Sequence, residues 1–141
     1  MVKIVIPIEP VEQARPRYTS RGRFVRVYDP PKVSQFKKDL GYWMQDYMTK
    51  RNIRRFETPL TVTFTFYRKL QKSLSKVERE RRLQGVHPPT VKPDLSNYLK
   101  STEDALNEIL WKDDAQIVEE HIVKKYAEEP RIELEIKEWS N

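Results

Sequence analysis

Polar residues in the C-terminal half of the sequence have the types and spacing that metal-assisted catalysis requires. Steps of three, four and three residues, which place side chains on one face of a helix, separate Asn97, Lys100, Asp104 and Asn107. Asp94 lies just before this helix, and the pair Asp113-Asp114 lies just after it. Carboxylate oxygens are ligands for Mg²⁺, and an ammonium group can stabilise developing negative charge. This set therefore indicates a candidate metal-dependent active site.

Structural roles compete with this interpretation. Asp94 could cap the helix, Asp113-Asp114 could form a turn, and Lys100 with Asp104 could be an ion pair on a solvated face. A straight helix would also hold Asp94 and Asp114 roughly 25 Å apart at 1.5 Å per residue. The two carboxylates can meet only if the chain turns back after Trp111 and the next segment lies beside the helix start. Spacing alone does not establish that return.

The elements that must position these residues can be read from the hydrophobic pattern. Helical spacing of apolar residues predicts a long helix over 32–50 and a second helix over 95–110. A short basic helix should begin after Ser73 or Ser75 and end near Gly85. Alternating or β-branched runs predict strands over 2–8, 60–67, 117–126 and 131–139. The last two strands should form a hairpin closed by Glu128-Glu129-Pro130. We expect one domain over 1–141, of mixed α+β (α/β) class, with a small mixed sheet packed against two main helices.

Composition limits the classes of function. The 141 residues carry a net charge of +6 and no cysteine, so disulfides, zinc fingers and thiol nucleophiles are excluded. The 15 aromatic residues argue against a disordered chain. No apolar run approaches the ~20 residues of a transmembrane helix, so we expect a cytoplasmic protein without membrane contact.

The charge is unevenly distributed. Residues 1–102 hold 22 basic and 9 acidic side chains, a net charge of +13, whereas residues 103–141 hold 5 basic and 12 acidic ones, a net charge of −7. A basic body suggests nucleic acid as partner, because cations release counterions from phosphates. Two segments concentrate this charge, a turn or hairpin over 15–26 and the short helix near 76–82. Their candidate DNA-binding residues are Arg15, Arg17, Arg21, Arg23, Arg26, Lys76, Arg79, Arg81 and Arg82.

Three segments together resemble the RusA family of Holliday junction resolvases. They are Lys92-Pro-Asp-Leu-Ser-Asn-Tyr-Leu-Lys100, Asp104-Ala-Leu-Asn107 and Trp111-Lys-Asp-Asp-Ala-Gln-Ile-Val118. The segment Pro7-Ile-Glu-Pro-Val-Glu-Gln-Ala-Arg-Pro-Arg17 is similar to the Gram-positive and prophage branch of that family. The resemblance covers most of the chain in order, and its core pattern is long and specific.

The resemblance implies a homodimeric, Mg²⁺-dependent endonuclease that nicks four-way DNA junctions symmetrically, with Mn²⁺ as an alternative ion. It assigns metal binding to Asp94 and Asp114, with Asp113 as an acidic neighbour, and catalysis to Lys100 with both aspartates. Asn97 and Asp104 match the polar face beside the lysine. It also implies that the strand containing Asp114 returns to the helix start.

One position departs from the family pattern. Ser96 stands where the usual second aspartate is expected, and a serine hydroxyl can contact Mg²⁺ but adds no negative charge. Three alternatives therefore stay open: a nuclease for flaps or other branched DNA, a non-catalytic branched-DNA-binding protein with a decayed metal site, and a basic structural protein.

Overall fold

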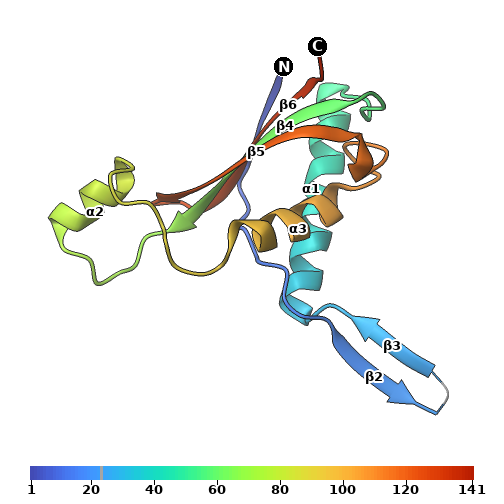
Figure 1. The fold of residues 1–141 in the computed structure, drawn as a ribbon, viewed down its shortest axis with the longest axis horizontal. Coiled ribbons are helices and arrows are strands. Elements are labelled where there is room, and N and C mark those ends of the chain that lie inside the picture. The colour runs from blue at the N-terminus through green and yellow to red at the C-terminus, as the bar shows by residue number, and fades with distance from the viewer. Residues whose placement is uncertain (23) are drawn as a thin grey trace.

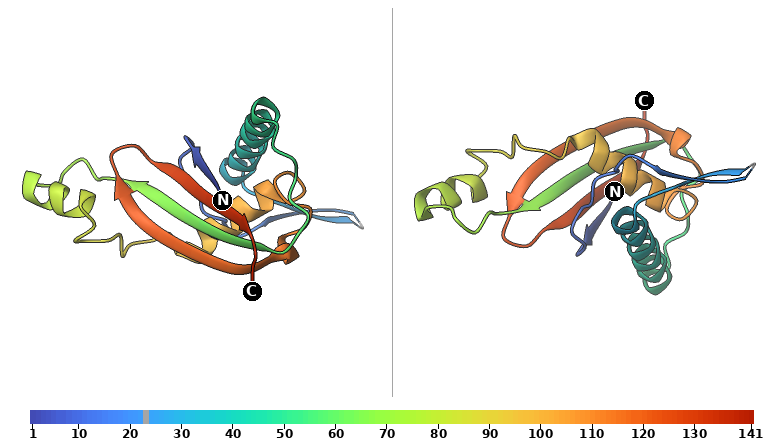
Figure 2. Two further views of the ribbon diagram at one scale, coloured as in Figure 1. Left: turned by 90° about the horizontal axis from the view of Figure 1, so that it is seen from above. Right: turned by 90° about the horizontal axis from the view of Figure 1, so that it is seen from below.

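A four-stranded mixed sheet with two helices packed on one face forms the body of the protein (Figures 1 and 2). The structure is a computed structural model that describes residues 1–22 and 24–141. The strand order is β1-β6-β4-β5, in which β6 runs antiparallel to both neighbours and β4 and β5 are parallel. The sheet consists of β1 (Val2–Ile6), β4 (Leu60–Lys69), β5 (Ile117–Ala127) and β6 (Arg131–Glu138). The two packed helices are α1 (Pro31–Arg51) and α3 (Leu95–Leu106).

Side-chain alternation along β4 explains which face the helices cover. Leu60, Val62, Phe64 and Phe66 are completely buried, whereas Thr63 and Thr65 between them are partly exposed. Successive side chains of a strand point to opposite faces, so the even-numbered residues form one apolar stripe. The helices complete the core with residues three and four apart, which in α1 are Val33, Phe36, Leu40, Met44 and Met48.

The mixed α+β class, the single body and the two main helices are therefore confirmed, but the predicted C-terminal hairpin is wrong. Strands β5 and β6 do not pair with each other, because β4 lies between them and pairs with both. The three residues 128–130 cross the end of β4, and three residues can span two strand spacings of about 4.8 Å each. Alternation shows which face of a strand is buried and not which strand lies beside it.

Helix α3 also ends four residues earlier than the spacing predicts. Glu108 adopts a left-handed conformation with φ of 68°, which breaks the helical path after Asn107. Ile109 and Leu110 extend the apolar pattern because the turn that contains them packs into the core. The hydrophobic pattern therefore continues beyond the helix.

Two arms extend from opposite ends of this body (Figure 1). One is the two-stranded ribbon of β2 (Arg17–Arg21) and β3 (Phe24–Tyr28), which confirms a hairpin in the arginine-rich segment. The other carries α2 (Lys76–Leu83), whose first turn is capped by Ser75 accepting a hydrogen bond from the backbone N–H of Glu78. Among the described residues, none of the helices combines the length and apolar character needed to cross a lipid bilayer.

Candidate active site and DNA-binding arms

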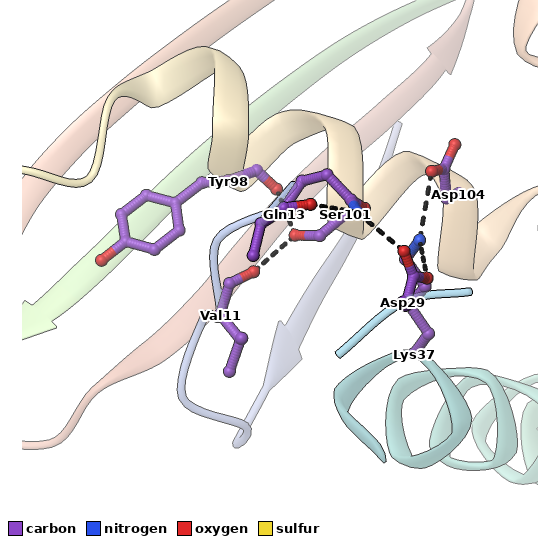
Figure 3. Close-up of polar contacts among 8 residues, drawn as sticks. Val11, Gln13, Asp29, Lys37, Tyr98, Ser101 and Asp104 are labelled. Atoms are coloured by element: carbon purple, nitrogen blue, oxygen red, sulfur yellow. Dashed lines mark hydrogen bonds and ion pairs between the residues drawn. The ribbon is translucent and has the colours of Figure 1, made fainter. Parts of the chain in front are cut away.

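The strap, residues 7–16 between β1 and β2, holds helix α3 in place. The backbone N–H of Gln13 donates to the carbonyl of Asn97 at 2.9 Å, and the hydroxyl of Ser101 donates to the carbonyl of Val11 (Figure 3). Ser101 is fully buried, and Lys100 beside it is exposed on the outer face of the helix. The strap therefore fixes the helix while its polar face stays open to solvent.

An ion-pair network joins the start of α1 to α3. Lys37 contacts Asp29 at 2.8 Å and Asp104 at 3.3 Å, and the side-chain amide of Gln13 donates to Asp29 at 2.9 Å (Figure 3). The hydrogen bond from Lys37 is the main reason that the pKa of Asp29 lies below its usual value. Asp104 therefore pairs with Lys37, a residue that the sequence analysis does not single out, and not with Lys100.

Asp94 lies at the N-terminal end of α3 with its side chain exposed. It occupies the N-cap position, yet its carboxylate makes no capping hydrogen bond, and the side chain is exposed together with that of Ser96. Lys124 of β5 lies nearby and donates to the carbonyls of Val91 and Pro93 at 2.8 and 2.9 Å. The competing interpretation of Asp94 as a helix cap is therefore wrong, and its carboxylate is available to a ligand.

Asp114 is anchored at the other end of α3. Its backbone N–H donates to the side-chain oxygen of Asn107 at 3.1 Å, and the indole N–H of Trp111 donates to its carboxylate at 2.6 Å. Partial burial, opposed by the Trp111 hydrogen bond, raises the pKa of Asp114 above its usual value, and Asp104 and Asp113 add to the increase. Asp113 caps the short helix Asp114–Gln116 by accepting from Ala115 N–H at 3.0 Å, so it has the structural role expected of a turn residue.

Within one chain, these positions do not fit a shared Mg²⁺ ion. Asp94 and Asn107 bracket the 12 residues of α3, so about 20 Å of helix axis separates them. The expected return of the chain to the helix start is made by β5, whose Lys124 donates to the carbonyl of Pro93, but Asp114 precedes β5 and stays beside Asn107 at the far end of α3. Mg²⁺ ligands lie about 2.1 Å from the ion, so one ion cannot contact both carboxylates. Among residues 1–22 and 24–141, no three His, Asp or Glu side chains group closely enough to hold a metal.

A second carboxyl pair lies between these ends. Glu103 of α3 faces Glu120 of β5, and the pKa of Glu103 is raised to about 9, first by burial and then by the hydrogen bond with Glu120. At neutral pH Glu103 therefore keeps its proton. The sequence analysis does not identify this pair because the two residues belong to separate elements, and only the tertiary fold brings α3 beside β5.

Replacing Glu103 with glutamine should remove a pH dependence of stability. The folded protein binds this proton up to about pH 9, whereas an unfolded glutamate loses it near its ordinary value, so stability falls as pH rises between these two values. Glu103→Gln should raise the free energy of unfolding by about 1–2 kcal/mol at pH 8.5, a value discounted for partial exposure, and by much less at pH 5. Chemical denaturation at both pH values measures this. If the free energy of unfolding changed between pH 5 and pH 8.5 by as much in the variant as in the wild type, the raised pKa of Glu103 would be contradicted.

The two arms carry the predicted DNA-binding cations. All described side chains of β3 are exposed, including Arg26, and Arg17 begins β2. Arg21 ends β2, and Arg15 precedes it on an exposed segment. Arg23 lies outside the described residues. The hairpin also exposes large apolar side chains, which are Tyr18, Phe24, Val25, Val27 and Tyr28.

The cations of α2 divide into two kinds. Arg82 pairs with Glu78 at 2.8 Å and lies over the ring of Tyr126, with 4.9 Å between its guanidinium carbon and the ring centroid. Arg79 pairs with Glu128 at 3.0 Å. These two arginines fasten the arm to the body, whereas Lys76 and Arg81 are exposed and have no ion pair among the described residues.

Both a protein-family model and a bacterial protein match this chain over nearly its whole length. The family model described as endodeoxyribonuclease RusA matches residues 7–137. A protein of Bacillus subtilis strain 168, named uncharacterized protein YqaN, is 37% identical over 141 residues, which covers 99% of this chain and 97% of the relative. The family match extends over the strap, both arms, both main helices and strands β4, β5 and most of β6, whereas β1 precedes it.

Proposed function

The chain belongs to the RusA endodeoxyribonuclease family, and we propose on that premise that it is a structure-selective nuclease that resolves four-way DNA junctions by paired nicking. The observation that carries the proposal is the arrangement of charge. Two cationic arms extend from opposite ends of the body, with α3 between them (Figure 1). The side chains of Lys100 on α3 and of Asp94 at its start are exposed. Arm cations can contact phosphates on diverging duplexes, and such contacts fix orientation without reading sequence.

We propose that the active form is a homodimer and that a divalent cation, Mg²⁺ or alternatively Mn²⁺, is required. A shared ion needs carboxylates from two chains, because Asp94 and Asp114 of one chain lie at opposite ends of α3. In an isologous dimer, Asp94 of one protomer can meet Asp114 of the partner subunit at two equivalent places. Two equivalent sites also match the two symmetric cuts that junction resolution requires.

Substrate preference tests this proposal directly. We expect wild-type protein to nick a labelled four-way junction in paired positions in Mg²⁺, to leave linear duplex of the same sequence largely intact, and to lose activity in EDTA. We expect this preference because the two arms extend in different directions (Figure 1). The diverging duplexes of a junction can contact both arms and α3 together, and we propose that one straight duplex makes fewer of these contacts. Gel analysis of products over time measures the rates.

Other outcomes favour the alternatives that the sequence leaves open. Faster cutting of a flap than of a four-way junction would replace the junction by other branched DNA as substrate. Tight junction binding without metal-dependent nicking would favour the non-catalytic binding protein, with Ser96 as the mark of a decayed site. Equal cleavage of linear duplex would contradict structure selectivity altogether.

A further inference from the structure

A cationic cavity lies beside the start of α3. It has a volume of about 580 Å³ and lies where four segments converge: the N-terminal strap, the start of α1, the end of β4 and the loop before α3. Its basic lining residues are Arg17, Lys32, Arg68, Lys69 and Lys92. Glu9 and Glu12 are its acidic lining residues, so the formal charge of the wall is +3. Such a wall favours an anionic occupant over a neutral one.

Arg68 is the unusual member of this lining. The alternation of β4 places it on the helix-covered face, directly after the buried residues Phe64 and Phe66. Its Nη1 atom is buried and has no hydrogen-bond partner among the described residues, and neither Glu9 nor Glu12 lies within ion-pair distance of it. A buried donor without an acceptor destabilises the fold, and an unpaired guanidinium does so more than a neutral group. A bound anion would satisfy this donor.

The wall of the cavity formed by α3 belongs to the hydrophobic core. Tyr98 of α3 lines the cavity, is only 4% exposed, and stacks on Phe66 with ring centroids 5.4 Å apart. Both rings belong to the core, so this wall is rigid. The planar guanidinium of arginine can donate two parallel hydrogen bonds to phosphate oxygens, which lysine cannot do.

Two segments beside the cavity indicate which anion it binds. Arg17 begins the basic hairpin, and Lys92-Pro93 immediately precedes Asp94, so the cavity connects the predicted DNA-binding arm to the candidate active site. We propose that Arg68 binds a backbone phosphodiester of the DNA strand in this cavity, adjacent to the phosphate that is cut. Arg68 is then a positioning residue, and the inference rests on the proposed function.

Charge removal at Arg68 tests this. Arg68→Gln should weaken four-way junction binding about 10-fold and reduce the magnitude of the slope of log Kd against log salt concentration by about one. Arg68→Lys should restore the slope but not the full affinity. The matched control is Arg54→Gln, which removes an exposed arginine outside the cavity and should leave both values close to wild type. Arg68→Gln with the slope and affinity of Arg54→Gln would overturn the proposal.

A measurement on unmodified protein keeps the test valid if Arg68→Gln fails to fold. Phenylglyoxal modifies accessible guanidinium groups, and mass spectrometry of peptides reports each arginine separately. Junction DNA should protect Arg68 at least about 5-fold, while Arg54 stays reactive, because only a phosphate in the cavity blocks the guanidinium. Protection by 10 mM inorganic phosphate without protection by DNA would assign the cavity to a free anion and overturn the backbone assignment.

These outcomes are separable from failure of the proposed function. Wild-type protein that neither binds nor nicks junctions would contradict the proposed function itself. Wild-type protein that nicks junctions while DNA leaves Arg68 reactive would contradict only the role of Arg68.

Discussion

An equimolar mixture of Asp94→Asn and Asp114→Asn chains is expected to recover about a quarter of the wild-type active sites, although each variant alone should lose at least about 100-fold in nicking rate. Random pairing makes half of the dimers mixed. If each site combines Asp94 of one protomer with Asp114 of the partner subunit, every mixed dimer has one site with both carboxylates and one site with neither. The expected product is therefore a single nick and not a pair of cuts.

The structural basis for this expectation is the length of α3. About 20 Å of helix axis separates Asp94 from Asn107, to which Asp114 is bonded. A cruciform plasmid measures the outcome, because paired cuts linearise it and single nicks only relax it. Mixed chains must first be unfolded and refolded together so that the subunits exchange. Relaxed plasmid should appear only in the co-refolded mixture.

A control separates this effect from a general loss of negative charge. Asp39 is an exposed carboxylate on α1 that lies outside the candidate site, and Asp39→Asn should keep the wild-type rate alone and in mixtures. Inactive mixtures of the two site variants, with mixed dimers shown by sedimentation, would mean that both carboxylates act within one chain and would contradict the shared site.

Local signals made part of the fold predictable. Helix α1 follows from apolar residues such as Phe36, Leu40 and Met44 at helical spacing, and α2 follows from the Ser75 cap. Both signals lie within a few residues of the element that they define. The partner of a strand is not encoded in this way, because the alternation along β6 is the same whichever strand lies beside it. The error over β5 and β6 is of this kind.

The same distinction between local and long-range signals applies to the candidate site. Asp94, Lys100 and Asp114 could be named from residue types and motif, since each lies in a contiguous segment. Lys37 could not be connected to Asp104, which is 67 residues away in sequence. Glu120 could not be placed against Glu103 without knowing that β5 runs beside α3. Contacts that tune charge at this site are long-range, and sequence spacing carries no information about them.

Lys100→Ala is expected to lower the rate of junction nicking by about 10²–10³-fold at saturating protein while changing junction Kd by less than about 3-fold. Lys100 is exposed on the outer face of α3 and forms no ion pair among residues 1–22 and 24–141. The nearby carboxylate of Asp29 is already occupied by Lys37 and Gln13. The ammonium of Lys100 is therefore free to face a phosphate whose negative charge grows as the bond breaks.

Because Lys100 faces the reacting phosphate, its loss should slow junction nicking more than it weakens junction binding. An interaction that strengthens only as charge develops contributes to the transition state and little to the bound ground state. Loss of one cation from the 27 of the chain should change the salt dependence of binding by at most about one unit of slope. Lys100→Arg keeps the charge but changes its geometry, so it should recover part of the lost rate.

Single-turnover nicking of a labelled junction and gel-shift titration in EDTA measure rate and affinity separately. Lys38→Ala, which removes an exposed lysine of α1, is the matched control and should leave both values unchanged. If Lys100→Ala weakens binding as strongly as it slows nicking, Lys100 contributes a phosphate contact of the ordinary kind. If Lys100→Ala nicks at the wild-type rate, the catalytic role of Lys100 is wrong, and the charge that stabilises the transition state must come from another residue near the start of α3.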